Sequence, residues 1–186
     1  MPMTKQWKLP IDRPHNLVAS AGNLTFLGGA GDFDHCGDIR NRDLVDQIQG
    51  SLENIAQLLP VENCSMDDVV KIKAYYTPDD NLSEWGVVAQ IANAFKRSPL
   101  PVISTLPVPM QPFDNQRIQL QVMAQRNWRS LNDIQVHETP VPESHQHLFK
   151  HKSLSSALRA GEFITVANRT AGDLDDHIES ELDPVS

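Results

Sequence analysis

The sequence predicts an α+β two-layer sandwich with the element order ββαβαββ, in which two helices cover one face of a single sheet. Residues 69–77 and 117–125 alternate apolar with polar side chains, which is typical of strands that have one solvated face. Residues 41–59 and 83–97 carry apolar side chains at three- and four-residue steps, which is typical of amphipathic helices. The other strands belong to a hairpin before the first helix and to a proline-bounded segment after the second.

The first two strands are predicted as a β-hairpin within residues 16–34. Two apolar segments, Leu17–Ala19 and Leu24–Leu27, flank the small turn residues Ala21-Gly22-Asn23. The glycines that follow allow the backbone to approach another group closely: Gly28, Gly29 and Gly31. They do not form a phosphate loop, because the Gly-Lys-Ser/Thr ending and the spacing of a dinucleotide fingerprint are both missing.

Both predicted helices have sequence signals at their ends. Asp43 and Asp46 lie near the start of the first helix, where the helix dipole favours anions, and Pro60 ends it. Ser83 is the predicted N-cap of the second helix. The predicted buried stripes are Leu44, Ile48, Leu52, Ile55 and Leu59 in the first helix, and Trp85, Val88, Ala92 and Phe95 in the second.

The later strands give the sheet an apolar face and a polar face. Residues 102–106 predict a short strand, and the prolines after it confine the next residues to an edge or a loop. The two alternating strands place apolar residues on one side: Val70, Ile72, Ala74 and Tyr76, then Ile118, Leu120, Val122 and Ala124. The opposite face of the last strand carries the amides of Gln119, Gln121 and Gln125. These amides fit a solvated face or a cleft between subunits.

Composition narrows the class of protein. The chain has 186 residues, a hydrophobic content of 40% and a net charge of -8, which fits a folded domain and argues against a nucleic-acid partner. No apolar run is long enough to cross a membrane, and the N-terminal segment lacks the apolar part of a signal peptide. Two cysteines do not form a disulfide scaffold. We therefore expect a cytoplasmic protein without a membrane partner.

The chain divides into three parts. We expect one domain in residues 1–127, a polar linker in residues 128–150 and the start of a repeat in residues 151–186. The repeat is indicated by the similarity of SAGNLTFLGGAGD in the first hairpin to RAGEFITVANRTAGD near the C-terminus. An unrelated hairpin is the alternative. The residues after this second hairpin, 173–186, are acidic, and we expect them to be loose.

Several motifs resemble the RidA/YjgF family, also known as endoribonuclease L-PSP. The segment CSMDDVVKIKAYYTPDDN is similar to the family's serine, acidic, Val-Val-Lys strand signature, and it is the most specific match. The Gly-rich end of the first hairpin, the helix DQIQGSLENIAQLL, the proline before VIST and the strand RIQLQVMAQR also resemble family segments. The resemblance covers residues 15–127.

The resemblance implies a chorismate-mutase-like fold and a homotrimer whose sheets pack into a barrel with clefts between subunits. It implies hydrolysis of reactive enamines and imines to keto acids and ammonia, without a cofactor. Four positions depart from the family pattern: Ile103 replaces a carboxylate-binding arginine, Gln119 a water-positioning glutamate, Ala89 an asparagine and Gly28 a small hydroxyl residue. Isoleucine offers no charge-assisted bond to a carboxylate, and an amide does not act as a base near neutral pH.

We therefore expect a divergent family member that binds a small metabolite less anionic than an amino-acid imine. The predicted catalytic residues are Gln119 and Ser104, and the predicted substrate-binding residues are Gly29, Ala30, Ile103 and Thr105. An imine or enamine deaminase and a catalytically silent binding or scaffold module both remain open. An RNA-cleaving enzyme follows only from the family's older name, and the acidic composition argues against it.

Two histidine- or cysteine-containing segments are weaker candidates. The loop DFDHCGD, residues 32–38, offers a thiol, an imidazole and carboxylates, which fits a reactive cysteine, a metal site or simply a polar loop. The polar loop is the preferred interpretation, because no second group of spaced ligands supports a metal. The segment SHQHLFKH contains His145, His147 and His151, which fit a solvated linker better than a surface metal site. We expect no metal and no cofactor.

Overall fold

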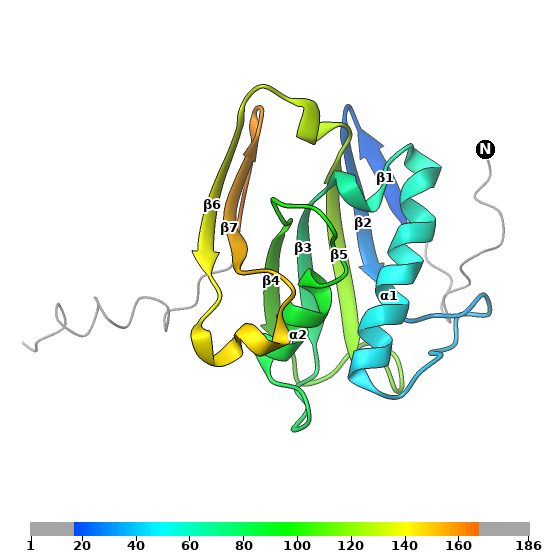
Figure 1. The fold of residues 1–186 in the computed structure, drawn as a ribbon. Helices are drawn as coiled ribbons and strands as arrows, with labels where there is room; N and C mark the ends of the chain where they lie inside the picture. The colour runs from blue at the N-terminus through cyan, green and yellow to red at the C-terminus, as the bar shows by residue number, and fades with distance from the viewer. Residues whose placement is uncertain (1–16, 168–186) are drawn as a thin grey trace, which may run out of the picture.

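The computed structural model describes residues 17–167, and its first part is a five-stranded sheet with two helices on one face (Figure 1). The strand order is β1-β2-β5-β3-β4, with β3 and β4 parallel and the other pairs antiparallel. The predicted order ββαβαββ is confirmed by these elements: β1 Val18–Ala21, β2 Leu24–Ala30, α1 Leu44–Leu58, β3 Val69–Tyr76, α2 Glu84–Ala92, β4 Val102–Pro107 and β5 Ile118–Gln125.

The first helix begins three residues after the start of its predicted range, and the second begins directly after its predicted N-cap. The Asp43 side chain accepts a hydrogen bond from the Val45 N–H and caps α1, and the Ser83 hydroxyl accepts one from the Gly86 N–H and caps α2. The predicted end of α2 at Arg97 is wrong, since the helix stops at Ala92. The next residue, Asn93, uses its side chain to bind the backbone of Leu148 and Lys150, so a tertiary contact follows directly on the helix end.

One strand residue lies on the opposite face from the one predicted. The pairing of β3 with β5 shifts between Val69 and Lys71, which is the sign of a β-bulge. Val69 and Ile72 therefore face the helices, whereas Val70 belongs to a separate apolar cluster on the other face. Strict alternation had placed Val70 together with Ile72. The extra residue of the bulge reverses its direction.

A second sheet follows, and part of it lies where the sequence predicts a linker. Its strand order is β6-β7-β8, antiparallel throughout, with β6 Ile134–Pro140, β7 Ser153–Ala160 and β8 Phe163–Val166. Residues 128–150 thus contain a paired strand, because backbone groups of β6 find partners on β7. The strands β7 and β8 form the predicted second hairpin. Short 3-10 helices complete the described elements: Leu59–Glu62, Met66–Asp68, Trp128–Ser130 and Glu143–Leu148.

The second sheet lies beside β4 and is fastened to the first part of the chain (Figure 1). The Ser155 hydroxyl donates to the Leu100 carbonyl at 2.6 Å, and both groups are buried. Trp85 of α2 contacts the rings of His145 and Phe149 with centroid distances of 5.1 and 6.1 Å. Within residues 17–167, no helix combines the length and the hydrophobicity needed to span a membrane. The predicted acidic segment 173–186 lies outside the described residues.

Candidate functional site

The face of the five-stranded sheet that the helices leave uncovered carries the polar residues singled out in the sequence. Alternate residues of β5 explain this, because Ile118, Leu120 and Val122 are buried in the core under the helices. The residues between them point to the other side, and they include Gln119, Gln121 and Met123. This side is called the open face below.

Gly29 and Gln119 are brought together on the open face. The pairing of β2 with β5 shifts between Leu27 and Ala30, so Gly28 and Gly29 lie in an irregular part of β2. Gly29 has a φ of 73°, which a residue with a side chain rarely adopts. A Cβ atom at position 29 would also collide with the amide nitrogen of Gln119. The backbone conformation therefore favours glycine here, whereas the amide end of the flexible Gln119 side chain could move away from a Cβ atom.

Two residues on the face of β3 that the sequence predicts to be solvated lie next to this pair. Tyr75 is the register partner of Gln119, and Lys73 is the partner of Gln121. The Lys73 ammonium lies 5.0 Å from the centre of the Tyr75 ring, within the range of a cation–π contact. The alternation of apolar and polar residues in β3 predicts that these two side chains share a face. That they lie beside Gln119 follows only from the pairing of β3 with β5. The resulting group is Gly29, Gln119, Tyr75 and Lys73, called the open-face site below.

The open-face site contains one positively charged residue, Lys73, in a chain whose net charge is -8. Burial lowers the pKa of the nearby Lys71, and the positive charge of Lys73 lowers it further. Within residues 17–167, neither lysine forms an ion pair; the ion pairs of this part of the chain use arginines. The Lys71 ammonium already donates to the Val166 carbonyl at 2.9 Å, so Lys73 is the cation of this pair that can attract an anionic ligand to the open-face site.

The six predicted site residues do not all face the same way. Ser104 of β4 is the register partner of Lys73, and it is only 3% exposed. Ile103 instead packs against the core under the helices, and the Thr105 hydroxyl donates to the carboxylate of Glu84 on α2. Ala30 is buried in that same core. Their predicted roles remain predictions, but within one chain the side chains of Ile103 and Thr105 lie on the opposite face from Gln119.

The second sheet covers one end of the open face. Val70, Val102 and Met123 pack there against Leu158 and other apolar residues of the second sheet. At this end Gln125 is buried, and its amide nitrogen donates to the Ala160 carbonyl at 3.2 Å. Of the three predicted amides, Gln125 is therefore a packing residue, whereas Gln119 and Gln121 remain at the uncovered end.

A separate cavity of about 320 Å³ lies at the junction of the two sheets. Its lining is Arg97, Ser98, Pro99, Trp128, Arg129 and Ile134, so it contains none of the predicted site residues. Arg129 stacks on Trp128 at 4.4 Å and donates to the carbonyls of Asp67, Ser98 and Pro99. These hydrogen bonds hold the residues after β5 against the segment before β4, so Arg129 stabilises the fold.

The two weaker candidate segments differ in the structure. His145 stacks on Trp85, and a ring nitrogen of His151 lies 3.0 Å from the Phe95 carbonyl, so both histidines take part in packing. Cys64 is buried, with its sulfur 3.3 Å from the Thr25 hydroxyl, whereas Cys36 is exposed. Among residues 17–167, the group of three ligand-type side chains close enough to hold one metal ion is Asp34, His35 and Cys36.

Comparison with known proteins gives one consistent result. Residues 10–125 match the family model described as Endoribonuclease L-PSP. A RutC family protein of Pyrococcus horikoshii is 35% identical over 63 residues, which cover 33% of this chain and 50% of that protein. The matched segment thus spans about half the length of this curated relative.

Solved structures show the same fold at low identity. RidA from the Antarctic bacterium Psychrobacter sp. is similar with a TM-score of 0.56 and 20% identity, covering 65% of this chain and 94% of that one. The YjgF gene product of E. coli is similar with a TM-score of 0.55 and 20% identity, covering 67% and 96%. In both, nearly the whole neighbour matches about two thirds of this chain.

Proposed function

Because the chain belongs to the endoribonuclease L-PSP family, which includes the RidA and YjgF proteins, we propose that it binds a small metabolite at its open-face site. The observation that carries this proposal is the contact of Gln119 with the backbone of Gly29, beside Tyr75 and Lys73. An amide, a phenol, an ammonium group and a glycine backbone offer hydrogen bonds of both kinds and one positive charge. This set fits a small molecule with a carboxylate and a carbonyl or imine group.

The expectation of a less anionic substrate depends on Ile103, whose side chain lies on the opposite face from the open-face site. Ile103 removes the arginine that the family resemblance implies, but Lys73 on the neighbouring strand supplies a cation on the open face. An ammonium group binds a carboxylate as a point charge, without the two parallel bonds of a guanidinium. We therefore propose an anionic substrate held more loosely in orientation than an arginine would hold it.

The proposed reaction is hydrolysis of an imine or enamine to a carbonyl compound and ammonia. Water adds to the carbon of the protonated C=N group, and the C–N bond of the resulting carbinolamine then breaks to release ammonia. The Gln119 carbonyl oxygen can accept a hydrogen bond from the attacking water and orient it, although an amide cannot take up its proton. The proposed reaction consumes water alone and needs no cofactor.

The proposal includes a homotrimer in the cytoplasm, with the site completed by a second copy of the chain. Support comes from exposed apolar side chains of the open face, since Phe26 pairs with Met123 nearer the second sheet and Leu106 pairs with Tyr75 at the uncovered end. Phe26 is 44% exposed and Leu106 is 39% exposed, and both are large enough to stabilise a subunit contact. A neighbour would cover the end that the chain's own second sheet leaves uncovered.

The test is keto-acid release from imines that an amino-acid oxidase generates in the same solution. We expect wild type to exceed the uncatalysed rate, and Gln119→Ala to lose at least about tenfold of that acceleration. Lys73→Gln should impair substrates with a carboxylate and spare neutral imines. Gln121→Ala is the matched control, because this neighbouring amide lies on the same strand and face but not in the open-face site.

Two results would count against the proposal. Equal activity of Gln119→Ala and wild type would remove Gln119 from the site. No acceleration by wild type would contradict the deaminase, and binding of a keto acid without turnover would then indicate a silent binding module.

A further inference from the structure

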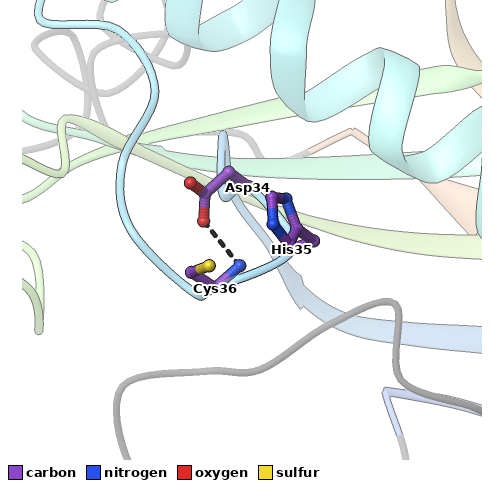
Figure 2. Close-up of side chains that lie close together, drawn as sticks. All are labelled: Asp34, His35 and Cys36. Atoms are coloured by element: carbon purple, nitrogen blue, oxygen red, sulfur yellow. Dashed lines mark hydrogen bonds between the residues drawn. The ribbon is translucent and has the colours of Figure 1, made fainter.

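The loop after β2 turns sharply and brings three chemically different donor groups together. The ligand atoms of Asp34, His35 and Cys36 all lie within 4.8 Å of one another, although the residues are consecutive in sequence (Figure 2). Consecutive residues of an extended chain point in alternating directions, so this convergence depends on the loop conformation. His35 and Cys36 are exposed, so both can be reached from solvent.

The turn itself is held by backbone hydrogen bonds. One oxygen of the Asp34 carboxylate accepts hydrogen bonds from the N–H groups of Cys36 and Asp38 at 2.8 and 3.0 Å (Figure 2). The Asp34 N–H donates to the Asp38 carbonyl, and Gly37, with a φ of 92°, donates to the Asp34 carbonyl. The oxygen of Asp34 that lies toward Cys36 in Figure 2 is the one that accepts these hydrogen bonds, and the second oxygen points away, so the carboxylate would bind a shared ion through the first oxygen or after rotation.

Both ends of the loop are anchored in the folded structure. Phe33 and Ile39 pair as an isolated β-bridge, and Phe33 is 3% exposed with its ring 5.5 Å from that of Phe113. Asp32 is fully buried, and its carboxylate lies 2.6 Å from the Arg40 guanidinium. The three donors therefore sit on a short segment whose ends are fixed, which limits the entropy lost when they close around an ion.

We propose that Asp34, His35 and Cys36 form a binding site for a divalent zinc ion, with water as the fourth ligand. A carboxylate, an imidazole and a thiolate are all zinc ligands, and three protein ligands with an open fourth position are an established zinc arrangement. The mixture of donors disfavours magnesium and calcium, which prefer oxygen alone. On binding, the Cys36 thiol gives its proton to solvent and its sulfur forms the bond to zinc.

The distances allow this geometry with a small movement. Ligand bonds of about 2.0 to 2.3 Å place the donor atoms of a tetrahedral zinc site roughly 3.3 to 3.8 Å apart. The observed upper distance of 4.8 Å exceeds this by an amount that side-chain rotation at His35 and Cys36 can supply. The site is independent of the open-face site, because it shares no residue with it.

The experiment is calorimetric titration of the full chain with zinc chloride after treatment with a chelator, together with absorption spectra of the cobalt-substituted protein. We expect one zinc ion per chain and a thiolate-to-cobalt charge-transfer band. Cys36→Ser should abolish that band, and His35→Ala should weaken zinc binding by at least about tenfold. Both residues are exposed, so circular dichroism should show an unchanged fold.

Two control variants separate this site from other ligands in the chain. Cys64→Ser changes the other cysteine, which is buried, and should leave the cobalt band intact. His147→Ala changes the histidine-containing segment and should leave zinc binding unchanged. Stoichiometric binding that survives both His35→Ala and Cys36→Ser would overturn the proposal. Absence of binding by the wild-type chain would also overturn it.

Discussion

The two hairpins of this chain, β1–β2 and β7–β8, have the same local structure and bury opposite faces. In the first, Ala21 pairs with Leu24 across Gly22-Asn23, and in the second, Ala160 pairs with Phe163 across Gly161-Glu162. The turn glycines have nearly equal φ values of 61° and 63°. Each hairpin has four residue pairs counted from its turn. By this count, Leu27 of the first hairpin corresponds to Val166 of the second.

The surroundings of the two hairpins then differ. Leu27 is 2% exposed because α1 covers its side of the sheet, whereas Val166 is 54% exposed. On the other side of the hairpins the exposures are reversed, because Phe26 of the first is 44% exposed and its counterpart Thr165 in the second is 5% exposed. The second hairpin thus packs the equivalent of the open face against the first sheet. Local sequence specifies the turn and register, and the partner specifies which face becomes core.

The largest expected effect concerns the junction that gives the second hairpin its buried face. Trp128 is fully buried between the two sheets, and its indole N–H donates to the Asp67 carbonyl at 3.0 Å. Trp128→Ala should lower the free energy of unfolding by about 3 to 5 kcal/mol, because it leaves a large cavity. Urea unfolding followed by circular dichroism measures this.

Leu131→Ala, three residues away and 37% exposed, is the control for Trp128→Ala. It should change the free energy of unfolding by less than about 1 kcal/mol. If Trp128→Ala behaved like this control, the packing between the two sheets would contribute little to stability.

The next effect tests the two hairpins at corresponding positions. Leu27→Ala should cost about 2 to 5 kcal/mol of unfolding free energy, because the side chain is in the core. Val166→Ala should cost less than about 0.5 kcal/mol, because the side chain is exposed. Urea titrations of both variants give the comparison. A similar cost at the two positions would show that the exposed side of β8 is covered in solution.

A smaller effect should be shared by the two hairpins. Gly22→Ala and Gly161→Ala should each cost about 1 to 2 kcal/mol, because both positions need a left-handed backbone. No atom lies near a Cβ at Gly22, so this cost is conformational. Gly22→Asn should recover part of it, since asparagine tolerates this conformation. Thermal unfolding measures all three, and an equal loss for Ala and Asn would point to another cause.

The smallest effect is a pH dependence that links the two sheets. The Lys71 ammonium donates to the Val166 carbonyl at 2.9 Å, and burial lowers its pKa below the ordinary value of 10.5. Between the lowered pKa and 10.5 the unfolded chain binds more protons than the folded chain, so the contribution of Lys71 to stability rises with pH. Below this window the cost of burying the charge is fully present.

The comparison of wild type with Lys71→Met checks this dependence. The stability of wild type relative to the variant should increase as the pH rises toward 10.5, as seen in urea titrations at several pH values. Lys96→Met, at an exposed position after α2, is the control. A difference that stays constant with pH would mean that Lys71 titrates alike in both states.

Much of the fold could be predicted because local signals agree with tertiary structure. Asp43 and Ser83 were recognised as helix-start residues, and their side chains cap α1 and α2 in the structure. The predictions were wrong where contacts with residues far away in the sequence determine the local structure. The bulge at Val70 depends on pairing with β5, and the early end of α2 is followed by bonds from Asn93 to a segment more than 50 residues away.

The candidate site was predictable only in part for the same reason. Gly29 and Gln119 could be singled out by family resemblance, but their contact depends on the pairing of β2 with β5. Lys73 and Tyr75 were visible as polar positions of a strand, and nothing local showed that they would lie beside Gln119. The convergence of Asp34, His35 and Cys36 likewise needed the turn around Gly37.

The sequence by itself determined the kinds and order of the elements of the first sheet and its helices, and the turns of both hairpins. These features depend on side-chain periodicity, helix caps and glycine conformations, which act within a few residues. Only the tertiary structure decided which face of each hairpin is buried and which polar residues meet on the open face. Those outcomes depend on contacts between strands far apart in the chain, and burial there is shared between partners that no local pattern specifies.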